Sequence, residues 1–243
     1  MTYDEGWLQQ APLLTAKNWR HGWTTSQGPD FRADPTSGDI VVSVAELVQA
    51  TGLEVGAWAR QVHGGRVLEV TERGFAGEAD ALWSVQPGLG VVGRSADCPL
   101  ILVGGPRQDG SRIWGFAHAS WRSTVKGITA GLILAMTEGG AVPSRLRAVI
   151  CPSAGPCCYE VKDEVRQTAL RSLGPGAAWF FMEKSEGLCF NLWAANIAQL
   201  KAAGVLEDNI HNVEHCTICG GDRYPSYRRE GDLAGRFAAV IGF

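Results

Sequence analysis

Apolar residues in this chain gather in short runs, each bounded by glycine, proline or aspartate. Runs of this length between turn-forming residues are typical of buried β-strands. Most of them fall in the middle of the chain, where they follow one another closely. They predict strands at residues 56–62, 79–85, 88–95, 99–105, 112–119, 146–152, 178–183 and 211–216.

Longer segments have apolar residues three and four positions apart, the spacing of an amphipathic helix. They predict helices at residues 40–52, 123–140, 159–174 and 192–204. The segment 123–140 opens with a Ser-Thr pair that can cap a helix and closes on two glycines. Gly52, Gly174 and Gly204 end the other helices in the same way.

Strands in the middle of the chain and helices interleaved around them favour an α/β (α+β) fold, with a mixed β-sandwich core flanked by helices. The chain has 243 residues, of which 45% are apolar, enough for a large core. No stretch rich in proline, glycine and serine separates two parts. We therefore expect residues 1–243 to form a single catalytic domain.

Charge and targeting signals narrow the class of protein. The net charge is −3, and no basic run or acidic tail is present, so we expect neither a nucleic-acid nor a membrane-surface partner. The first residues lack a basic segment followed by an apolar one, and no apolar run approaches the roughly 20 residues of a membrane span. Seven cysteines, an odd number, suit reduced thiols in the cytoplasm.

Three residues that can bind a metal each stand at the end of a predicted strand: His63 in "QVHGG", Cys98 in "SADCP" and His118 in "AHASWR". Strand ends can converge on one point although they are far apart in sequence. Two imidazoles and a thiolate suit zinc. Three protein ligands leave the fourth position open for water or substrate, which is the catalytic pattern.

Other interpretations of these residues stay open. Each histidine could be a hydrogen-bonded structural residue, and Cys98 a small buried apolar one. Cys98 could also be a thiolate nucleophile with His118 as its base, as in a metal-free cysteine hydrolase or deamidase. Copper is less favoured than zinc, because the chain has only five histidines and few methionines. Asp97 could orient a histidine ligand, move a proton or simply form a turn.

Further cysteines and arginines carry weaker signals. Cys216 and Cys219 form a lone Cys-x-x-Cys pair, whereas a zinc ribbon needs a second such pair. The neighbouring Cys157 and Cys158 are expected to pack in a tight turn rather than to bind a metal together. Arginines in "DRYPSYRREGDLAGR" stand among turn residues, where they either face solvent or hold an anion such as phosphate.

Several motifs occur in a fixed order between residues 61 and 236: "QVHG", "SADCP", "AHASWR", "GPCCYEV", "LWAANIAQL" and "SYRREG". In this combination the chain resembles the bacterial multicopper polyphenol oxidoreductase (laccase) family. That family is now regarded as zinc-dependent purine nucleoside phosphorylases that also act as adenosine deaminases and methylthioadenosine phosphorylases, and some members are described as peptidoglycan-editing factors.

The resemblance implies a site, a substrate and a fold. It makes His63, Cys98 and His118 the zinc ligands, and it implies purine nucleoside and phosphate as substrates. It implies an α/β sandwich like the catalytic domain of cytotoxic necrotizing factor. We further expect Asp97 to be catalytic, and Gln61, Arg122, Arg228 and Arg229 to contact substrate, the arginines by holding phosphate.

This chain departs from the family pattern at several positions. Ser120 and Ser123 replace glycines, and Asn191 replaces an aspartate before the helix at 192. The segment before the first helix is short and lacks an Asn-Arg pair. These departures affect the expected substrate pocket more than the metal ligands. They also leave open a non-catalytic protein that retains zinc and binds a partner.

Overall fold

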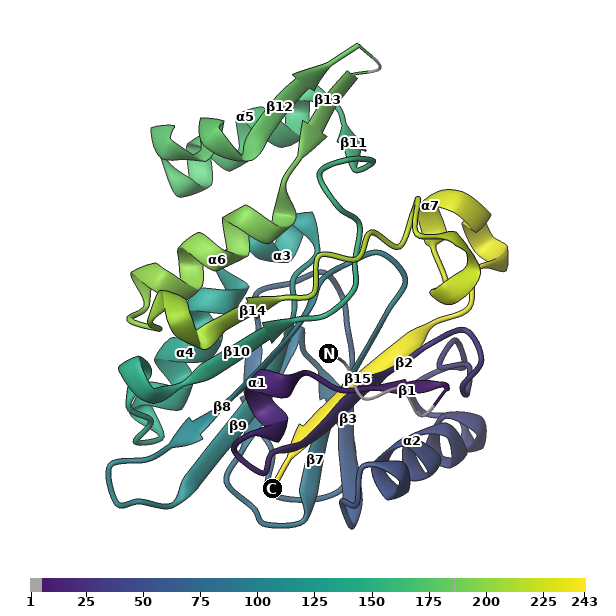
Figure 1. The fold of residues 1–243 in the computed structure, drawn as a ribbon, viewed down its shortest axis with the longest axis vertical. Helices are drawn as coiled ribbons and strands as arrows, with labels where there is room; N and C mark the ends of the chain where they lie inside the picture. Colours follow the sequence, from purple (N-terminus) through teal and green to yellow (C-terminus); the bar gives the residue numbers. More distant parts are fainter. Residues whose placement is uncertain (1–5, 186) are drawn as a thin grey trace.

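The central strands pair into two mixed six-stranded sheets in the computed structural model, which describes residues 6–185 and 187–243 (Figure 1). The first sheet has the order β1 (Leu8–Gln9), β2 (Arg20–Thr24), β15 (Phe237–Gly242), β7 (Leu89–Ser95), β3 (Val55–Arg60), β5 (Gly74–Glu78). The second has the order β14 (Ile210–Asn212), β10 (Arg147–Ile150), β8 (Leu100–Pro106), β9 (Arg112–His118), β6 (Ala81–Ser84), β4 (Val67–Glu69).

The two sheets pack face to face, and their inner faces form the largest apolar cluster. Trp114 and Phe116 of β9 are fully buried there against Phe237 and Ile241 of β15. Gly93 of β7 is required by this packing, because a Cβ at that position would lie 2.5 Å from Phe116. Central strands buried on both faces explain why β7, β8 and β9 are almost continuously apolar.

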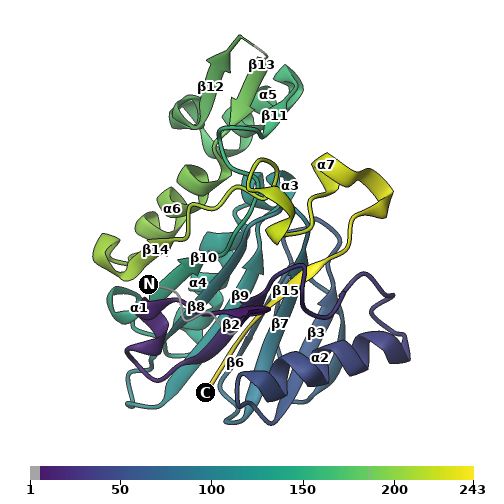
Figure 2. The same cartoon turned by 45° about the vertical axis from the view of Figure 1, so that its right-hand side comes forward.

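Helices cover the outer faces of the sandwich, as Figures 1 and 2 show from two directions. Helix α2 packs on the first sheet, and α4 with α6 packs on the second. A third, three-stranded sheet with the order β11 (Glu160–Val161), β13 (Gly187–Phe190), β12 (Phe181–Lys184) lies with α5 beyond them. The helices are α1 (Pro12–Thr15), α2 (Gly38–Ala50), α3 (Trp121–Val125), α4 (Ile128–Glu138), α5 (Asp163–Leu173), α6 (Leu192–Ala202) and α7 (Tyr227–Glu230).

The mixed α/β class is confirmed, and the predicted strands in the middle of the chain correspond to β3, β6, β7, β8, β9 and β10. The two later strand predictions are only partly right. Residues 175–180 form a 3-10 helix, and the strand begins at Phe181. Strand β14 ends at Asn212, and the residues after it form a loop.

The helices predicted at 40–52 and 192–204 are confirmed as α2 and α6. The predicted helix 123–140 is wrong as one element, because Gly127 adopts a left-handed conformation (φ +76°) between α3 and α4. Its cap is Ser120 rather than the Ser-Thr pair. The predicted helix 159–174 begins only at Asp163, since Glu160 and Val161 pair with β13.

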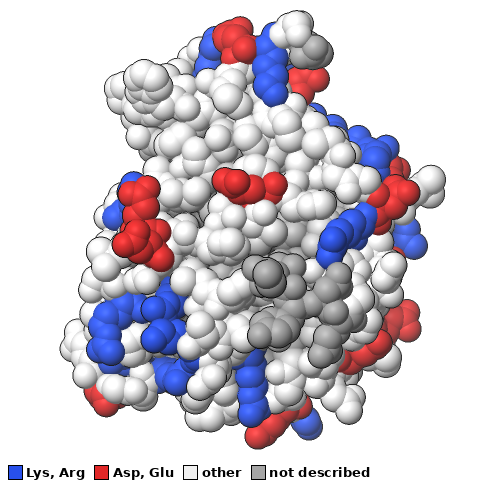
Figure 3. All heavy atoms as spheres, in the orientation of Figure 1, with Lys and Arg blue, Asp and Glu red and all other residues white. Residues whose placement is uncertain are grey.

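Charged side chains on the face shown in Figure 3 form several small groups of either sign. Across residues 6–185 and 187–243, no helix combines the length and apolar character needed to cross a membrane.

Candidate functional site

His63, Cys98 and His118 meet at one end of the sandwich. Strands β3 and β7 run parallel, so the loops after them, which carry His63 and Cys98, lie at the same edge. His118 is the last residue of β9 in the opposite sheet. The ligand atoms of the three residues lie within 4.8 Å of one another, and the two imidazole rings are 5.2 Å apart between centroids.

Asp80 holds both histidines in place. Its fully buried carboxylate accepts a hydrogen bond from His118 Nδ1 at 2.9 Å, which leaves Nε2 of that ring for the site. The same carboxylate accepts the backbone N–H groups of Val62 (3.2 Å), His63 (3.0 Å) and Gly64 (2.6 Å). A carboxylate behind a histidine ligand is the usual way in which a protein fixes the tautomer and orientation of the ring.

Two residues of the site have unusual backbone conformations. His63 has φ +57° and Asp97 has φ +94°, both in the region that side chains other than glycine rarely adopt. The turn at His63 wraps three N–H groups around Asp80. The turn at Asp97 directs Cys98 toward the two histidines, so the strain serves the geometry of the site.

The electrostatics of the trio favour a thiolate beside a charged imidazole in the metal-free protein. Burial raises the pKa of Cys98, but His118 and His63 outweigh it and lower that pKa to about 7. Burial lowers the pKa of His118, but the Cys98 thiolate and the Asp80 carboxylate raise it to about 9. A metal cation bound between the three residues would stabilise the Cys98 thiolate in place of the proton on His118.

A cavity of about 610 Å³ opens over the trio. Its volume lies in the range of sites for small molecules. Aromatic side chains line part of its wall: Trp121, Tyr159 and Tyr227. Five arginines also line it: Arg32, Arg94, Arg122, Arg228 and Arg236. Such a concentration of guanidinium groups favours an anionic ligand.

Asp97 lines this cavity, but it does not contact a histidine. Its carboxylate accepts the hydroxyl of Thr217 at 2.6 Å and the backbone N–H of Arg228 at 2.7 Å. Asp97 therefore joins the Cys98 turn to the loop at Thr217 and to α7. The expectation that Asp97 orients a histidine ligand is wrong, because Asp80 does so.

The four residues expected to contact substrate are placed differently. Arg122 and Arg228 line the cavity, with their guanidinium groups over Trp121 and Tyr159. Gln61 also lines it, but its amide pairs with the backbone N–H and C=O of Arg94. Arg229 is absent from the cavity lining, and its guanidinium donates to nearby carbonyl groups instead. Those carbonyls belong to Thr217, Ile218, Gly221 and Tyr224.

Sequence reasoning missed Asp80 and the pocket arginines Arg32 and Arg94. The sequence signal for Asp80 is its place directly before the apolar run "ALWSV". A carboxylate buried there needs several hydrogen-bond donors. The packing role predicted for Cys157 and Cys158 was also incomplete. Their sulfurs lie together with those of Cys216 and Cys219, so the second pair that the Cys-x-x-Cys motif lacked is present in space.

The chain belongs to the family described as multi-copper polyphenol oxidoreductase laccase, which matches residues 33–243. Among its relatives, a purine nucleoside phosphorylase, YlmD, from Geobacillus stearothermophilus is 32% identical over 84% of this chain and 78% of its own length. A purine nucleoside phosphorylase from Deinococcus radiodurans is 33% identical over 95% of this chain and 92% of its own. A third relative, named adenosine deaminase RL5, is 34% identical over 70% of this chain and 65% of its own.

Solved structures show the same fold. The crystal structure of YlmD from Geobacillus stearothermophilus has a TM-score of 0.83 and 29% identity, and the match covers 98% of this chain and 97% of that one. The hypothetical protein YfiH from Bacillus licheniformis has a TM-score of 0.86 at 24% identity, over 99% of this chain and 97% of its own.

Proposed function

We propose that this chain is a zinc-dependent purine nucleoside phosphorylase that acts on adenosine, inosine or methylthioadenosine, with residues 1–243 as one catalytic unit. The observation that carries the proposal is the convergence of His63, Cys98 and His118 at the base of a cavity rich in arginine and aromatic side chains. Relatives named purine nucleoside phosphorylase at about one-third identity support the same reaction.

The three residues fit zinc by chemistry and by geometry. Two imidazole nitrogens and a thiolate are ligands that zinc accepts, and these three ligand atoms lie within 4.8 Å of one another. Asp80 supplies the carboxylate that holds His118 with the correct nitrogen forward. Zinc bound there would supply a Lewis acid that stabilises negative charge on a reacting group.

The arginines hold phosphate for the reaction. In phosphorolysis a phosphate oxygen forms a bond to C1′ of the ribose, the bond from C1′ to N9 breaks, and the electron pair leaves with the purine, which is then protonated. Arg122 and Arg228 stand on the cavity wall with donors for a phosphate dianion. Holding that group in line with C1′ lowers the entropic part of the barrier.

The aromatic residues hold the purine. Trp121, Tyr159 and Tyr227 offer flat apolar surfaces against which a base can stack. We assign Asp97 a positioning role, because both of its oxygens already accept hydrogen bonds from Thr217 and from the backbone of Arg228. Gln61 and Arg229 stabilise the pocket walls through backbone groups rather than through substrate.

Adenosine deamination is proposed as a second activity of the same site. It needs no phosphate, because water replaces the amino group at C6 of adenine. The relative named adenosine deaminase RL5 supports it. The two activities are distinguished by their products, because phosphorolysis releases a free purine whereas deamination leaves the bond from base to ribose intact.

The test is release of free purine from adenosine, inosine and methylthioadenosine by the full chain, with and without phosphate and with and without a chelator. Phosphorolysis predicts release that depends on phosphate and stops on removal of zinc. Release that is independent of phosphate would contradict the reaction type. Release that survives complete removal of metal would contradict the role of zinc.

A metal-free cysteine hydrolase is the second candidate, because Cys98, His118 and Asp80 are connected as in a Cys-His-Asp triad. Substitution of His63 distinguishes the two candidate functions, because a Cys-His-Asp triad needs only one imidazole next to the sulfur. His63→Ala should abolish phosphorolysis and zinc binding by Cys98 and His118 if zinc is required. A metal-free His63→Ala enzyme that stays active and is inactivated by iodoacetamide would support the hydrolase instead.

A further inference from the structure

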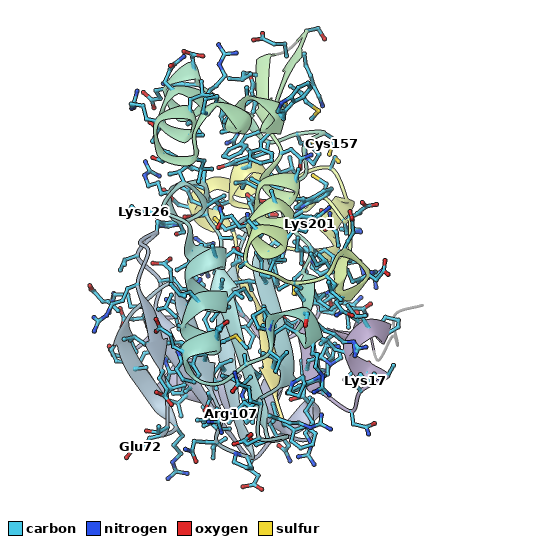
Figure 4. The ribbon with its side chains drawn as sticks, turned by 90° about the vertical axis from the view of Figure 1, so that its left-hand side faces the viewer. Lys17, Glu72, Arg107, Lys126, Cys157 and Lys201 are labelled. Carbon is cyan, nitrogen blue, oxygen red and sulfur yellow. The ribbon has the colours of Figure 1, made fainter. Side chains whose placement is uncertain are left out.

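Four cysteines from two distant segments bring their sulfurs together away from the His63–Cys98–His118 site. Cys157 and Cys158 stand in the turn before β11, and Cys216 and Cys219 in the loop after β14. The four Sγ atoms lie within 4.8 Å of one another, and those of Cys157 and Cys219 are 3.6 Å apart. Figure 4 labels Cys157, which lies just below the three-stranded sheet.

The spacing of the sulfurs fits a tetrahedral metal better than a disulfide. Bonds of about 2.3 Å from zinc to sulfur place tetrahedral ligands about 3.8 Å apart. The Sγ atoms of Cys157 and Cys219 are close to that separation and far beyond the roughly 2.05 Å of a covalent S–S bond. All seven cysteines are free thiols. Four thiolates form a soft ligand set that selects zinc over magnesium or calcium.

Backbone groups around Cys216 favour a negative charge on its sulfur. The N–H of Gly155 donates to Cys216 Sγ at 3.3 Å, and the N–H groups of Ile218 and Cys219 donate to the same sulfur. The donors Ile218 and Cys219 lie two and three positions after Cys216, so the backbone of the Cys-x-x-Cys segment curves around the Cys216 sulfur. The ammonium group of Lys184 donates a hydrogen bond to the backbone carbonyl of Cys157 at 2.9 Å, and this contact places a positive charge near the cluster.

The cluster joins a segment that lines the cavity to a second segment that supports the cavity wall through Asp97. Tyr159, on the cavity wall, directly follows Cys158. Thr217 directly follows Cys216 and donates its hydroxyl to Asp97. A bond between the two cysteine pairs therefore fixes Tyr159 and Asp97 relative to each other.

We propose that Cys157, Cys158, Cys216 and Cys219 bind a second zinc ion, as a closed structural site that holds together the two segments bearing Tyr159 and Thr217. Four protein ligands leave no open position, so this ion stabilises the cavity wall without reacting. The proposal stands on the geometry of the four sulfurs and does not depend on the reaction carried out at His63, Cys98 and His118.

The experiment is zinc analysis of the full chain, purified under reducing conditions with zinc present and dialysed free of excess metal. We expect two zinc ions per wild-type chain. Cys216→Ser/Cys219→Ser should retain one, and His63→Ala/His118→Ala should also retain one. Cys189→Ala, which removes a buried thiol outside the cluster, should retain two.

Cobalt identifies the ligands of the retained ion. His63→Ala/His118→Ala loaded with Co²⁺ should give the intense sulfur-to-metal absorption of a tetrahedral four-thiolate site. This variant decides the question even where the cysteine variant fails to fold. A folded His63→Ala/His118→Ala protein without bound metal would overturn the proposal, and so would a disulfide among the four cysteines in peptide maps of the reduced preparation. Neither result would affect the test of phosphorolysis.

Discussion

Asp80→Asn tests how the metal ligands are positioned. The substitution keeps the shape of the side chain and removes its charge and one acceptor oxygen. In the wild type, one carboxylate oxygen accepts from His63 N and His118 Nδ1, and the other accepts from Val62 N and Gly64 N. Whichever way the new amide turns, its NH₂ group faces two donors.

The expected loss of unfolding free energy follows from these four hydrogen bonds. Hydrogen bonds to a charged group contribute about 1.5–3 kcal/mol each, so losing two costs about 3–6 kcal/mol of unfolding free energy before the loop relaxes. Loss of the carboxylate behind a histidine ligand typically weakens metal binding about 10- to 100-fold. We expect Asp80→Asn to show both effects.

The assay is zinc affinity by competition with a chromophoric chelator, together with urea unfolding of the metal-free protein. Glu78→Gln is the matched control, because it makes the same chemical change on an exposed side chain two residues away. A folded Asp80→Asn protein with the zinc affinity of the wild type would refute the positioning role.

Two further substitutions test the cavity and the core. Arg228→Ala should lower kcat/KM for phosphate about 10- to 100-fold, because one charge-assisted contact that holds phosphate is lost; Arg171→Ala on the surface is the control, and equal kcat/KM values would contradict the assignment. Gly93→Ala should lower the unfolding free energy by about 1–3 kcal/mol in urea titration, because the methyl group would collide with Phe116. Gly176→Ala, where a Cβ meets nothing within 4 Å, should leave stability nearly unchanged, and a tolerated Gly93→Ala would show that the sheets can separate.

Much of the sandwich could be predicted from local pattern alone. Strands β7, β8 and β9 are almost continuously apolar because both of their faces are buried, and that signal does not depend on the rest of the fold. Strand β2, with the sequence "RHGWT", lacks it. That strand forms because β1 and β15 pair with its two edges, which no local pattern records.

The metal ligands could be found because strand ends and ligand type coincide at His63, Cys98 and His118. Asp80 could not be assigned, because its role depends on β6 lying beside β9, so that Asp80 is next to His118 across the sheet. The four-cysteine cluster was missed for the same reason. Cys157 and Cys219 are 62 residues apart, and only the fold brings them together.

Three of the departures from the family pattern, Ser120, Ser123 and Asn191, have structural explanations. Ser120 caps α3 by accepting the N–H of Ser123, and the two hydroxyls are 2.8 Å apart in a buried position. Asn191 caps α6 by accepting the N–H of Ala194. These polar residues satisfy helix ends and leave His118 in place, so they do not by themselves favour a non-catalytic protein.

Formation of a pentose 1-phosphate tests the central claim most directly. Inosine and phosphate are incubated with zinc-loaded wild-type protein; the sugar phosphate is followed by phosphorus NMR and the free base by liquid chromatography. We predict ribose 1-phosphate and hypoxanthine in equal amounts, no product after chelation, and recovery when zinc is restored. Hypoxanthine without ribose 1-phosphate, or unchanged turnover by the chelated protein, would contradict the account.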